Sequence, residues 1–416
     1  MQQPTHAVAA VSERRQWDRL MAMARIGAIA GDGVNRACLT DLDRQARRLL
    51  IGWGTDIGAA VSVDAAGNLW LRRDGTDAQA AAVVTGSHMD TQPNGGRFDG
   101  IYGVIAGLEA LTALHDAGMT PRRPVELVAW TNEEGGRFAP GCMGSMAWSG
   151  FKRIEDFADV RDPDGIRFDD ALTQHLAAEA DVPRRPLGGK PHAYVEAHIE
   201  QGPRLEADSL DIGVVTGIQG SRWFTVTLTG ETAHAGTTPL ALRRDAVQDM
   251  VRAITELNAL MHDPKDVLRF TVGRIVVEPN TSNSVADKAS FTIDFRHPDK
   301  HVLLTRGDAI AGVVRAAVRN ADVAVKETFH ALPIEFSPVV IDTVERAATD
   351  QGYRSLHLPS GAFHDAQFVA PVCPTGMIFV PCRKGISHNP AEYSEPGQLA
   401  AGTRVLTQAI VELASG

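Results

Sequence analysis

The sequence predicts a two-domain α/β protein, in which a ferredoxin-like α+β domain is inserted into a domain with a mostly parallel central sheet. The chain has 416 residues, more than one hydrophobic core usually spans. Short apolar strands alternate with helices in its outer parts, which is typical of parallel sheets. The pattern changes over residues 213–337, so residues 1–212 and 338–416 are assigned to the first domain.

Hydrophobic spacing predicts the elements of the first domain. Helices are expected over Ser12–Ala30 and Asp41–Trp53, followed by a hairpin of Val61–Val63 with Asn68–Leu71. The alternating elements that follow are the strand Ala81–Gly86, the helix Gly100–Ala117 and the strands Val125–Trp130, Tyr194–Ala197 and Met377–Val380. The segment Arg161–Lys190 is rich in Asp, Pro and Arg and is expected to be a surface excursion.

The inserted segment predicts the order strand–helix–strand–strand–helix–strand, which is ferredoxin-like. The first three strands are expected at Trp223–Leu228, Arg269–Val277 and Ala289–Phe295. The segment Val323–Phe336 is expected to end in the fourth strand. The two helices are expected at Leu240–Met261 and Val302–Asn320.

Composition narrows the class of function. A formal net charge of −10 argues against a nucleic-acid partner, because no basic stripe is present to neutralise phosphates. No apolar run approaches the length that crosses a bilayer, and Met1–Arg15 lacks the apolar core of a secretory signal. The four cysteines show no CxxC spacing, which favours a reduced, cytoplasmic setting and argues against a structural zinc site; they are Cys38, Cys142, Cys373 and Cys382.

Five residues of metal-ligand type lie at strand ends or at a helix start, where open α/β sheets place their ligand sites. They are His88, Asp99, Glu134, His198 and His388. Imidazole and carboxylate donors together suit first-row divalent metals, and a pair of metals needs a bridging carboxylate. Asp99, between the glycines Gly96 and Gly100, is the natural bridge. A lone histidine is usually a core or surface residue, and His6, His115, His175 and His262 keep that interpretation.

Two acidic residues beside these ligands suggest catalytic roles. Asp90 could accept a hydrogen bond from the far ring nitrogen of His88 and fix its tautomer. Glu133 and Glu134 follow one strand and point in different directions. One can therefore bind metal while the other stays free to act as a general base.

These residues lie in motifs that resemble the metal-dependent amidohydrolases of the M20 peptidase superfamily, in particular the hydantoinase/carbamoylase branch. That branch holds N-carbamoyl-L-amino-acid amidohydrolases, allantoate amidohydrolases and β-ureidopropionases. The resemblance covers essentially the whole chain. The matching motifs are Thr85–Thr91, Gly96–Gly100, Asn132–Gly135, His198–Gly202 and Ser387–Asn389.

The resemblance implies two divalent metal ions per subunit, which the ligand set leaves open among zinc, manganese, nickel and cobalt. Asp99 would bridge them, His88 and His198 would hold one, and Glu134 and His388 the other. The resemblance also makes Glu133 the general base. The resemblance also implies that the inserted domain is a lid that forms a homodimer. The peptidase branch commonly carries an acidic residue at the position of His198, so this histidine favours a ureido substrate over a peptide.

Substrate-facing residues are also implied. His234 would donate to the oxyanion from the neighbouring subunit, and Arg296 would bind the substrate carboxylate with Asn283 beside it. Gln201, Gly361 and His364 match further substrate-contact motifs; relatives more often carry a small residue at Phe363. The alternatives are a surface turn for His234, core packing for Phe363, and a salt bridge from Arg296 to Asp294 or Asp287.

The expected activity is hydrolysis of the carbamoyl C–N bond of an N-carbamoyl-L-amino acid, giving the amino acid, carbon dioxide and ammonia. The alternatives are an allantoate amidohydrolase or β-ureidopropionase, then an M20 dipeptidase or aminoacylase. A non-enzymatic binding protein on this fold is the alternative of a different class, and the presence of all five ligands with Glu133 argues against it.

Overall fold

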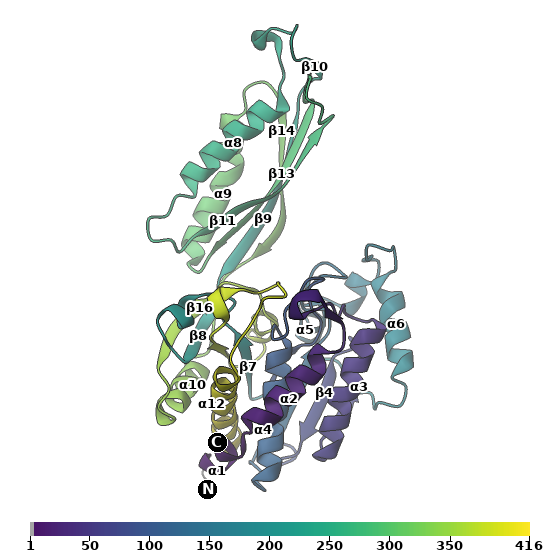
Figure 1. Ribbon diagram of the computed structural model, residues 1–416, viewed down its shortest axis with the longest axis vertical. Helices are drawn as coiled ribbons and strands as arrows, with labels where there is room; N and C mark the ends of the chain where they lie inside the picture. Colours follow the sequence, from purple (N-terminus) through teal and green to yellow (C-terminus); the bar gives the residue numbers. More distant parts are fainter. Residues whose placement is uncertain (1–3) are drawn as a thin grey trace. The chain divides into compact units, whose positions relative to one another are not determined.

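The computed structural model describes residues 4–416, which divide into two compact units (Figure 1). The larger unit runs up to Thr216 and resumes at Glu335–Gly416; the smaller unit is Gly217–Ile334. The first three residues of the segment considered above for a secretory signal lie outside the described part of the chain.

The larger unit is built around a mixed sheet whose four central strands run parallel. In spatial order these are β17 (Thr375–Val380), β7 (Ala193–Ile199), β5 (Val83–His88) and β6 (Val125–Trp130). Antiparallel strands flank them: β4 (Leu69–Arg73) and β3 (Ala60–Val63) beyond β6, and β8 (Ile212–Ile218) beyond β17. Two further strands pair with β8, namely β15 (Ile334–Glu335) and β16 (Ser355–Ser360). The central strands are buried on both faces, which explains why most of their residues are apolar.

Helices cover the sheet of the larger unit. On one face, α4 (Ile101–Asp116) packs on β5, β6 and β7, while α12 (Pro396–Ser415) packs on β7 and β17. Around these two lie α1 (Thr5–Ala10), α2 (Glu13–Ala24) and α10 (Pro338–Asp350), and α3 (Asp41–Asp56) packs on β3 and β4. The short helix α11 (Ala366–Val369) contacts β7, β17 and α5 (Met143–Trp148). The remaining short elements are β1 (Ala28–Ile29), η1 (Ala30–Asp32), β2 (Gly33–Val34), η2 (Ile154–Phe157), α7 (Arg204–Ala207) and η4 (Arg383–Gly385).

Two predictions for the larger unit need correction. The helix expected over Ser12–Ala30 ends at Ala24, and Gly27 then adopts a φ of 87°, which leads the chain into a short strand. The segment Arg161–Lys190 is not only a surface excursion. It contains α6 (Phe168–Ala178), which buries Phe168 and Leu172 against Phe157 and Phe138.

The smaller unit has the expected ferredoxin-like order of β9 (Gly220–Thr229), α8 (Ala246–Leu260), β11 (Arg269–Glu278), β13 (Lys288–His297), α9 (Lys300–Ala317) and β14 (Asp322–Ala331). Its sheet has the order β11–β13–β9–β14 and is antiparallel throughout. A separate pair is formed by β10 (Ala233–His234) and β12 (Ser284–Val285). The helix expected from Leu240 begins instead at Ala246, because Asp245 caps it by accepting from the N–H groups of Val247 and Gln248. Leu240–Leu242 form the 3-10 turn η3.

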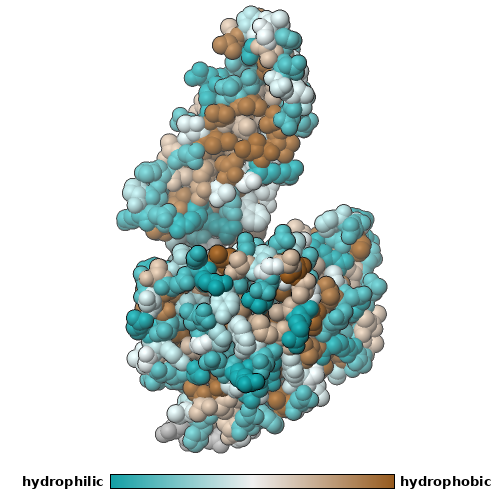
Figure 2. Space-filling view, viewed as in Figure 1, coloured by the Kyte–Doolittle hydropathy of each residue, from teal (hydrophilic) through white to brown (hydrophobic). Residues whose placement is uncertain are grey.

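The surface of the smaller unit carries a cluster of hydrophobic side chains on the face drawn in Figure 2. Large exposed apolar residues of this unit include Trp223, Leu240, Leu242, Val251 and Ile275. Patches of this kind commonly mark sites of protein association.

Within residues 4–416, no helix is both long enough and apolar enough to cross a bilayer.

Candidate metal centre

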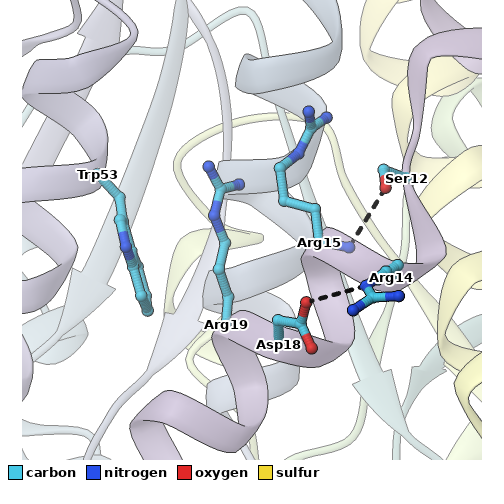
Figure 3. Close-up of a pocket in the computed structure, with 6 residues that line it drawn as sticks. All are labelled: Ser12, Arg14, Arg15, Asp18, Arg19 and Trp53. Carbon is cyan, nitrogen blue, oxygen red and sulfur yellow. Dashed lines mark hydrogen bonds and ion pairs between the residues drawn. The ribbon is translucent and has the colours of Figure 1, made fainter.

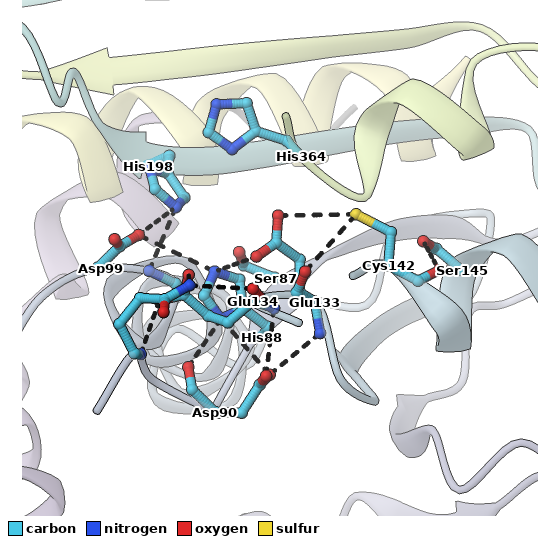
Figure 4. A network of polar contacts seen from close by, with 12 residues as sticks. Ser87, His88, Asp90, Asp99, Glu133, Glu134, Cys142, Ser145, His198 and His364 are labelled. Atoms are coloured by element: carbon cyan, nitrogen blue, oxygen red, sulfur yellow. Dashed lines mark hydrogen bonds and ion pairs between the residues drawn. The ribbon is translucent and has the colours of Figure 1, made fainter. Parts of the chain in front are cut away.

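The carboxyl ends of the parallel strands bring the predicted ligands together. His88 is the last residue of β5, His198 is the next-to-last residue of β7, and Glu133 and Glu134 follow β6 after two intervening residues. Asp99 lies two residues before α4, so its side chain can face the same edge of the sheet. Figure 4 shows His88, Asp99, Glu133, Glu134 and His198 converging there.

Asp99 lies between two groups of donors. Its Oδ1 is 3.1 Å from Nε2 of His198 and 3.9 Å from Nε2 of His88. Its Oδ2 is 3.3 Å from Nε2 of His388, which in turn is 3.3 Å from Oε2 of Glu134. The ligand atoms of each three-residue group lie within 4.8 Å of one another. One carboxylate thus offers one oxygen to each group, as a bridging ligand must.

The far ring nitrogens of two histidines are anchored to backbone carbonyls. Nδ1 of His88 donates to the carbonyl of Asp90 and Nδ1 of His198 donates to that of Ile199, both at 2.9 Å. This tautomer directs Nε2 of each ring toward Asp99, where it can bind a metal. The predicted hydrogen bond from His88 to the Asp90 carboxylate is wrong, because that oxygen lies 3.7 Å away and the carbonyl of the same residue is the acceptor.

The Asp90 carboxylate instead holds the glutamate pair. Oδ1 and Oδ2 of Asp90 accept from the backbone N–H groups of Glu133 and Glu134, each at 3.2 Å. The thiol Sγ of Cys142 lies 3.7 Å from Oε1 of Glu133, and the Cys142 N–H donates to the Glu133 carbonyl. Oε2 of Glu133 lies 3.3 Å from Nε2 of His88. The side chain of Glu133 therefore faces the first donor group, which is His88, Asp99 and His198. The side chain of Glu134 belongs to the second donor group, with Asp99 and His388.

Burial and mutual charge shift the pKa values in the centre. Burial raises the pKa of Glu133 well above its usual value, with the charge of Asp365 adding to it; burial and Asp99 raise the pKa of Glu134 to about 8. Burial lowers the pKa of His88 to about 4. Burial also opposes a charge on His198, but the hydrogen bond and charge of Asp99 outweigh it and raise the pKa to about 9. The Gly100 N–H points at Nε2 of His198 from 3.2 Å, which suits the neutral ring that a ligand requires.

The donor chemistry fits divalent metal ions. Each group combines imidazole nitrogen with carboxylate oxygen, the mixture that zinc and its neighbours in the first transition row bind. Cation binding would release the protons that Asp99 draws onto His198 and His388, so affinity for the metal is expected to rise with pH.

Position 100 accommodates only glycine, because the ring of His88 lies against it. A Cβ at Gly100 would overlap the His88 ring, and the residue has a φ of +65° that L side chains rarely adopt. We expect Gly100→Ala to cost at least about 1–2 kcal/mol in backbone strain and to lower metal content by displacing His88. Gly52→Ala is the control, because a Cβ there meets nothing within 4 Å in the helix α3. Thermal unfolding and metal analysis of both variants check this; equal metal content would contradict it.

The predicted substrate residues of the larger unit lie beside the centre. Nε2 of Gln201 donates to Oδ2 of Asp99 and to Oγ of Ser387, both at 3.0 Å. His364 is buried, its ring centroid lies 4.5 Å from that of His198, and its Nε2 is 2.9 Å from Oγ of Ser360. Gly361 lies in the same loop and is exposed. The structure thus brings Gln201 against Asp99 and His364 against His198, two of the candidate metal ligands.

Of the predicted residues of the smaller unit, His234 and Asn283 lie together, and Arg296 lies in the strand β13. His234 is exposed, and its Nδ1 accepts from the N–H groups of Gly236 and Thr237, so its Nε2 carries the ring proton. The carbonyl of Asn283 accepts from the N–H of Ala235, which places it beside His234. Arg296 forms the salt bridge that was the alternative, at 2.7 Å from Nη2 to Oδ2 of Asp294.

Four residues of the centre, three of them buried, escaped prediction. Glu392 accepts from the N–H groups of Phe98 and Asp99, and Ser387 donates to Asp99 at 2.9 Å. Glu196 accepts from Ser87 at 2.7 Å and, with His198 and His364, forms a third compact donor group. Asp365 lies next to His364, and burial followed by the charge of Glu196 raises its pKa well above the usual range. The signal for Glu392 was its place four residues after His388.

A hollow in the larger unit is lined by residues of α2 and by Trp53 of α3 (Figure 3). Arg15 and Arg19 line it, but both also bind the buried carboxylate of Glu109, at 2.6 and 3.1 Å. The guanidinium of Arg19 lies 5.7 Å from the Trp53 ring. These cations stabilise the packing of α2 on α4, and the lining residues include no metal-ligating histidine or cysteine.

Comparisons with known proteins agree with this geometry. Residues 84–412 match the family described as peptidase family M20/M25/M40. The chain is 40% identical over 407 residues to an N-carbamoyl-L-amino-acid amidohydrolase of Rhizobium meliloti, covering 97% of each protein. It is 35% identical over 403 residues to the allantoate amidohydrolase of Bacillus subtilis (strain 168), covering 95% of this chain and 97% of that one. The crystal structure of a hydantoinase/carbamoylase family amidase from Burkholderia multivorans matches with a TM-score of 0.88 at 44% identity, covering 98% of each chain.

Proposed function

Because the chain belongs to peptidase family M20/M25/M40, with hydantoinase/carbamoylase amidases among its close relatives, we propose that it hydrolyses the carbamoyl C–N bond of an N-carbamoyl-L-amino acid. The products are the amino acid, carbon dioxide and ammonia. The observation that carries this proposal is the placement of Glu133 beside His88, in the first of two donor groups that share Asp99. This arrangement suits hydrolysis of a linear amide.

Two divalent ions are proposed to be held by His88, Asp99 and His198 on one side and by Asp99, Glu134 and His388 on the other. When bound, such ions lower the pKa of water and polarise a carbonyl oxygen. Which ion serves is left open among zinc, manganese, nickel and cobalt. The hydrogen bonds from Nδ1 of His88 and of His198 to backbone carbonyls keep both rings in the tautomer whose Nε2 can bind a metal.

Glu133 is the proposed general base. It takes a proton from the attacking water and carries it to the leaving nitrogen. The raised pKa that burial gives this carboxyl matches both halves of that task, since the group must also hold the proton and then release it. Asp90 is a positioning residue rather than a proton carrier, because both of its oxygens accept from the backbone of the glutamate pair.

The smaller unit is proposed to be the lid and dimerisation domain, comprising residues 213–337, with residues 1–212 and 338–416 forming the catalytic domain. His234 donates from Nε2 to the developing oxyanion, and Arg296 with Asn283 holds the substrate carboxylate. Gln201, Gly361 and His364 complete the substrate contacts. The exposed apolar residues of this unit, such as Trp223 and Ile275, support a homodimer. Four buried cysteines, none in a disulfide, support a cytoplasmic location.

Arg296→Ala tests the carboxylate anchor. Losing a hydrogen bond to a charged group costs about 1.5–3 kcal/mol, so KM for carboxylate-bearing substrates should rise tenfold or more while kcat changes little. Steady-state kinetics measure both constants. Arg274→Ala, an exposed arginine on β11 of the same unit, is the control. An unchanged KM in Arg296→Ala would remove this residue from substrate binding.

The substrate is tested by measuring ammonia release from N-carbamoyl-L-amino acids, N-carbamoyl-β-alanine and allantoate, each with several divalent metals. We expect the highest kcat/KM with an N-carbamoyl-L-amino acid. Allantoate is the second candidate, because allantoate amidohydrolases are also similar over nearly the whole chain. Absence of ammonia from every ureido compound, with cleavage of a dipeptide or N-acyl amino acid instead, would overturn the proposal.

A further inference from the structure

Glu392 connects two segments of the metal centre that are 294 positions apart in the chain. Its side chain is 1% exposed. Oε1 accepts from the backbone N–H of Phe98 at 2.8 Å and from that of Asp99 at 3.0 Å. Oε2 accepts from Oγ of Ser387 at 3.1 Å. One buried carboxylate therefore fixes the backbone that carries Asp99 and the residue that precedes His388.

A ring of hydrogen bonds extends this connection to one oxygen of Asp99. Oγ of Ser387 lies 2.9 Å from Oδ2 of Asp99, and Nε2 of Gln201 donates to both of these atoms at 3.0 Å. A hydroxyl has a single proton, so Ser387 donates at any moment either to Asp99 or to Glu392. In both states the ring locates Oδ2, the oxygen that faces His388.

The surrounding chain packs closely around the side chain of Glu392. A Cβ at Gly96 would overlap its carboxylate, so the loop before Asp99 is closed around this side chain. The N–H of Glu392 donates to the carbonyl of Asn389 at 3.0 Å, which forms a turn directly after His388. Displacement of Glu392 would therefore displace His388 and the Asp99 loop together.

The two donor groups depend on this connection to different degrees. The side chains of His88 and His198 are 2% and 1% exposed and belong to strands of the central sheet, whereas the His388 side chain is 51% exposed and lies in a loop. The sheet positions the two histidines of the first group. In the second group, Gln92 and Asp90 hold Glu134 by hydrogen bonds, whereas His388 and Oδ2 of Asp99 depend on loop backbone and on the ring of hydrogen bonds.

We propose that Glu392 is a positioning residue that holds Oδ2 of Asp99 against His388 and thereby sets the affinity of the Asp99–Glu134–His388 group for its metal ion. The inference rests on the proposed two-metal centre and adds to it. It makes the two ions unequal, with the ion beside His88 and His198 retained and the ion beside His388 governed by Glu392.

The test is titration of metal-free protein with Zn²⁺ against a chromogenic chelator, which resolves two dissociation constants. Glu392→Ala removes all three contacts and should weaken the second site by about 10–100-fold, the usual effect of losing a residue that supports a ligand. The Zn²⁺ dissociation constant of the first site should stay within a few-fold of the wild-type value. Glu392→Gln keeps the acceptor for the two N–H groups and donates to Ser387, so it should restore most of the second-site affinity. Glu392→Asp is too short to reach all three partners and should resemble alanine.

The control is Glu109→Gln, another fully buried glutamate, which pairs with Arg15 and Arg19 in the packing of α2 on α4. It should lower the unfolding temperature and leave both zinc affinities unchanged. Equal weakening of both sites in Glu392→Ala and Glu392→Asp, or an unchanged second site in both, would overturn the role of Glu392. Wild-type protein that binds fewer than two zinc ions would overturn the proposed metal centre itself, which separates the two failures. If Glu392→Ala does not fold, Glu392→Asp with Glu392→Gln decides the question.

Discussion

Glu133→Gln should lower kcat by about 10²–10⁴-fold and leave two metal ions bound. Glutamine has the size of glutamate and can still accept from Cys142, whose Sγ lies 3.7 Å from Oε1 of Glu133. The backbone N–H of residue 133 still donates to Asp90. The amide cannot take a proton from water, so the loss falls on the chemical step and amounts to about 3–5 kcal/mol at 1.36 kcal/mol per factor of ten. KM should change little, because Glu133 is not a proposed substrate anchor.

Glu134→Gln is the matched comparison, since it changes the neighbouring residue in the same way. It removes a carboxylate that lies 3.3 Å from Nε2 of His388, so it should lower metal content to about one ion per subunit. Metal analysis, a ureido-substrate assay and thermal unfolding of both variants distinguish base from ligand. Near-normal turnover in Glu133→Gln would exclude Glu133 as the base, and loss of an ion from it would make Glu133 a ligand.

The convergence of the ligands could be predicted because it follows from strand direction. The strands β5, β6 and β7 are parallel neighbours. His88, Glu134 and His198 therefore lie at one edge of the sheet, independently of how the loops fold. The ferredoxin-like order of the inserted unit was equally predictable, since each strand and helix has its own hydrophobic period. The hairpin that contains β4 was predicted, but its antiparallel pairing with β6 was not, because local sequence patterns do not report which strands become neighbours. The strand β8, antiparallel to β17, was not predicted.

Boundaries were missed where one capping residue decides them. The apolar residues Leu240 and Leu242 fit a helical period, yet both are exposed, and Asp245 starts α8 by capping it. The prediction for Arg161–Lys190 rested on composition. The segment has many charged residues, so the helix α6, with Phe168 and Leu172 on its buried face, was not predicted.

The supporting residues of the centre could not be predicted, because their partners are distant in sequence. Glu392 bonds to Phe98 and Asp99, and Glu196 bonds to Ser87, which is 109 positions away. No periodicity encodes such pairs. Asp90 illustrates the same limit: the sequence placed it beside His88, but its carboxylate serves the backbone of Glu133 and Glu134.

Asp99→Asn should abolish activity and remove both metal ions, a larger effect than any change to Glu133. Asp99 is the residue common to the two donor groups, with Oδ1 toward His198 and Oδ2 toward His388. Asparagine keeps the size but has one acceptor oxygen, and its NH₂ group would face one of the two histidines in place of a ligand atom. His388→Ala, by contrast, removes a ligand from one group and should leave one ion bound.

Metal-dependent stability checks this result without an activity assay. A ligand that binds only the folded protein stabilises it by RT ln(1 + [L]/Kd), about 2.7 kcal/mol at a hundredfold excess over Kd. Zn²⁺ should therefore raise the unfolding temperature of chelator-treated wild type and not that of Asp99→Asn. Asp162→Asn is the control, because this buried aspartate pairs with Arg137 at 3.0 Å outside both donor groups and its variant should still respond to zinc. Two bound ions in Asp99→Asn would mean that the groups do not share a bridging carboxylate, and that Glu133, 3.3 Å from His88, is a ligand instead.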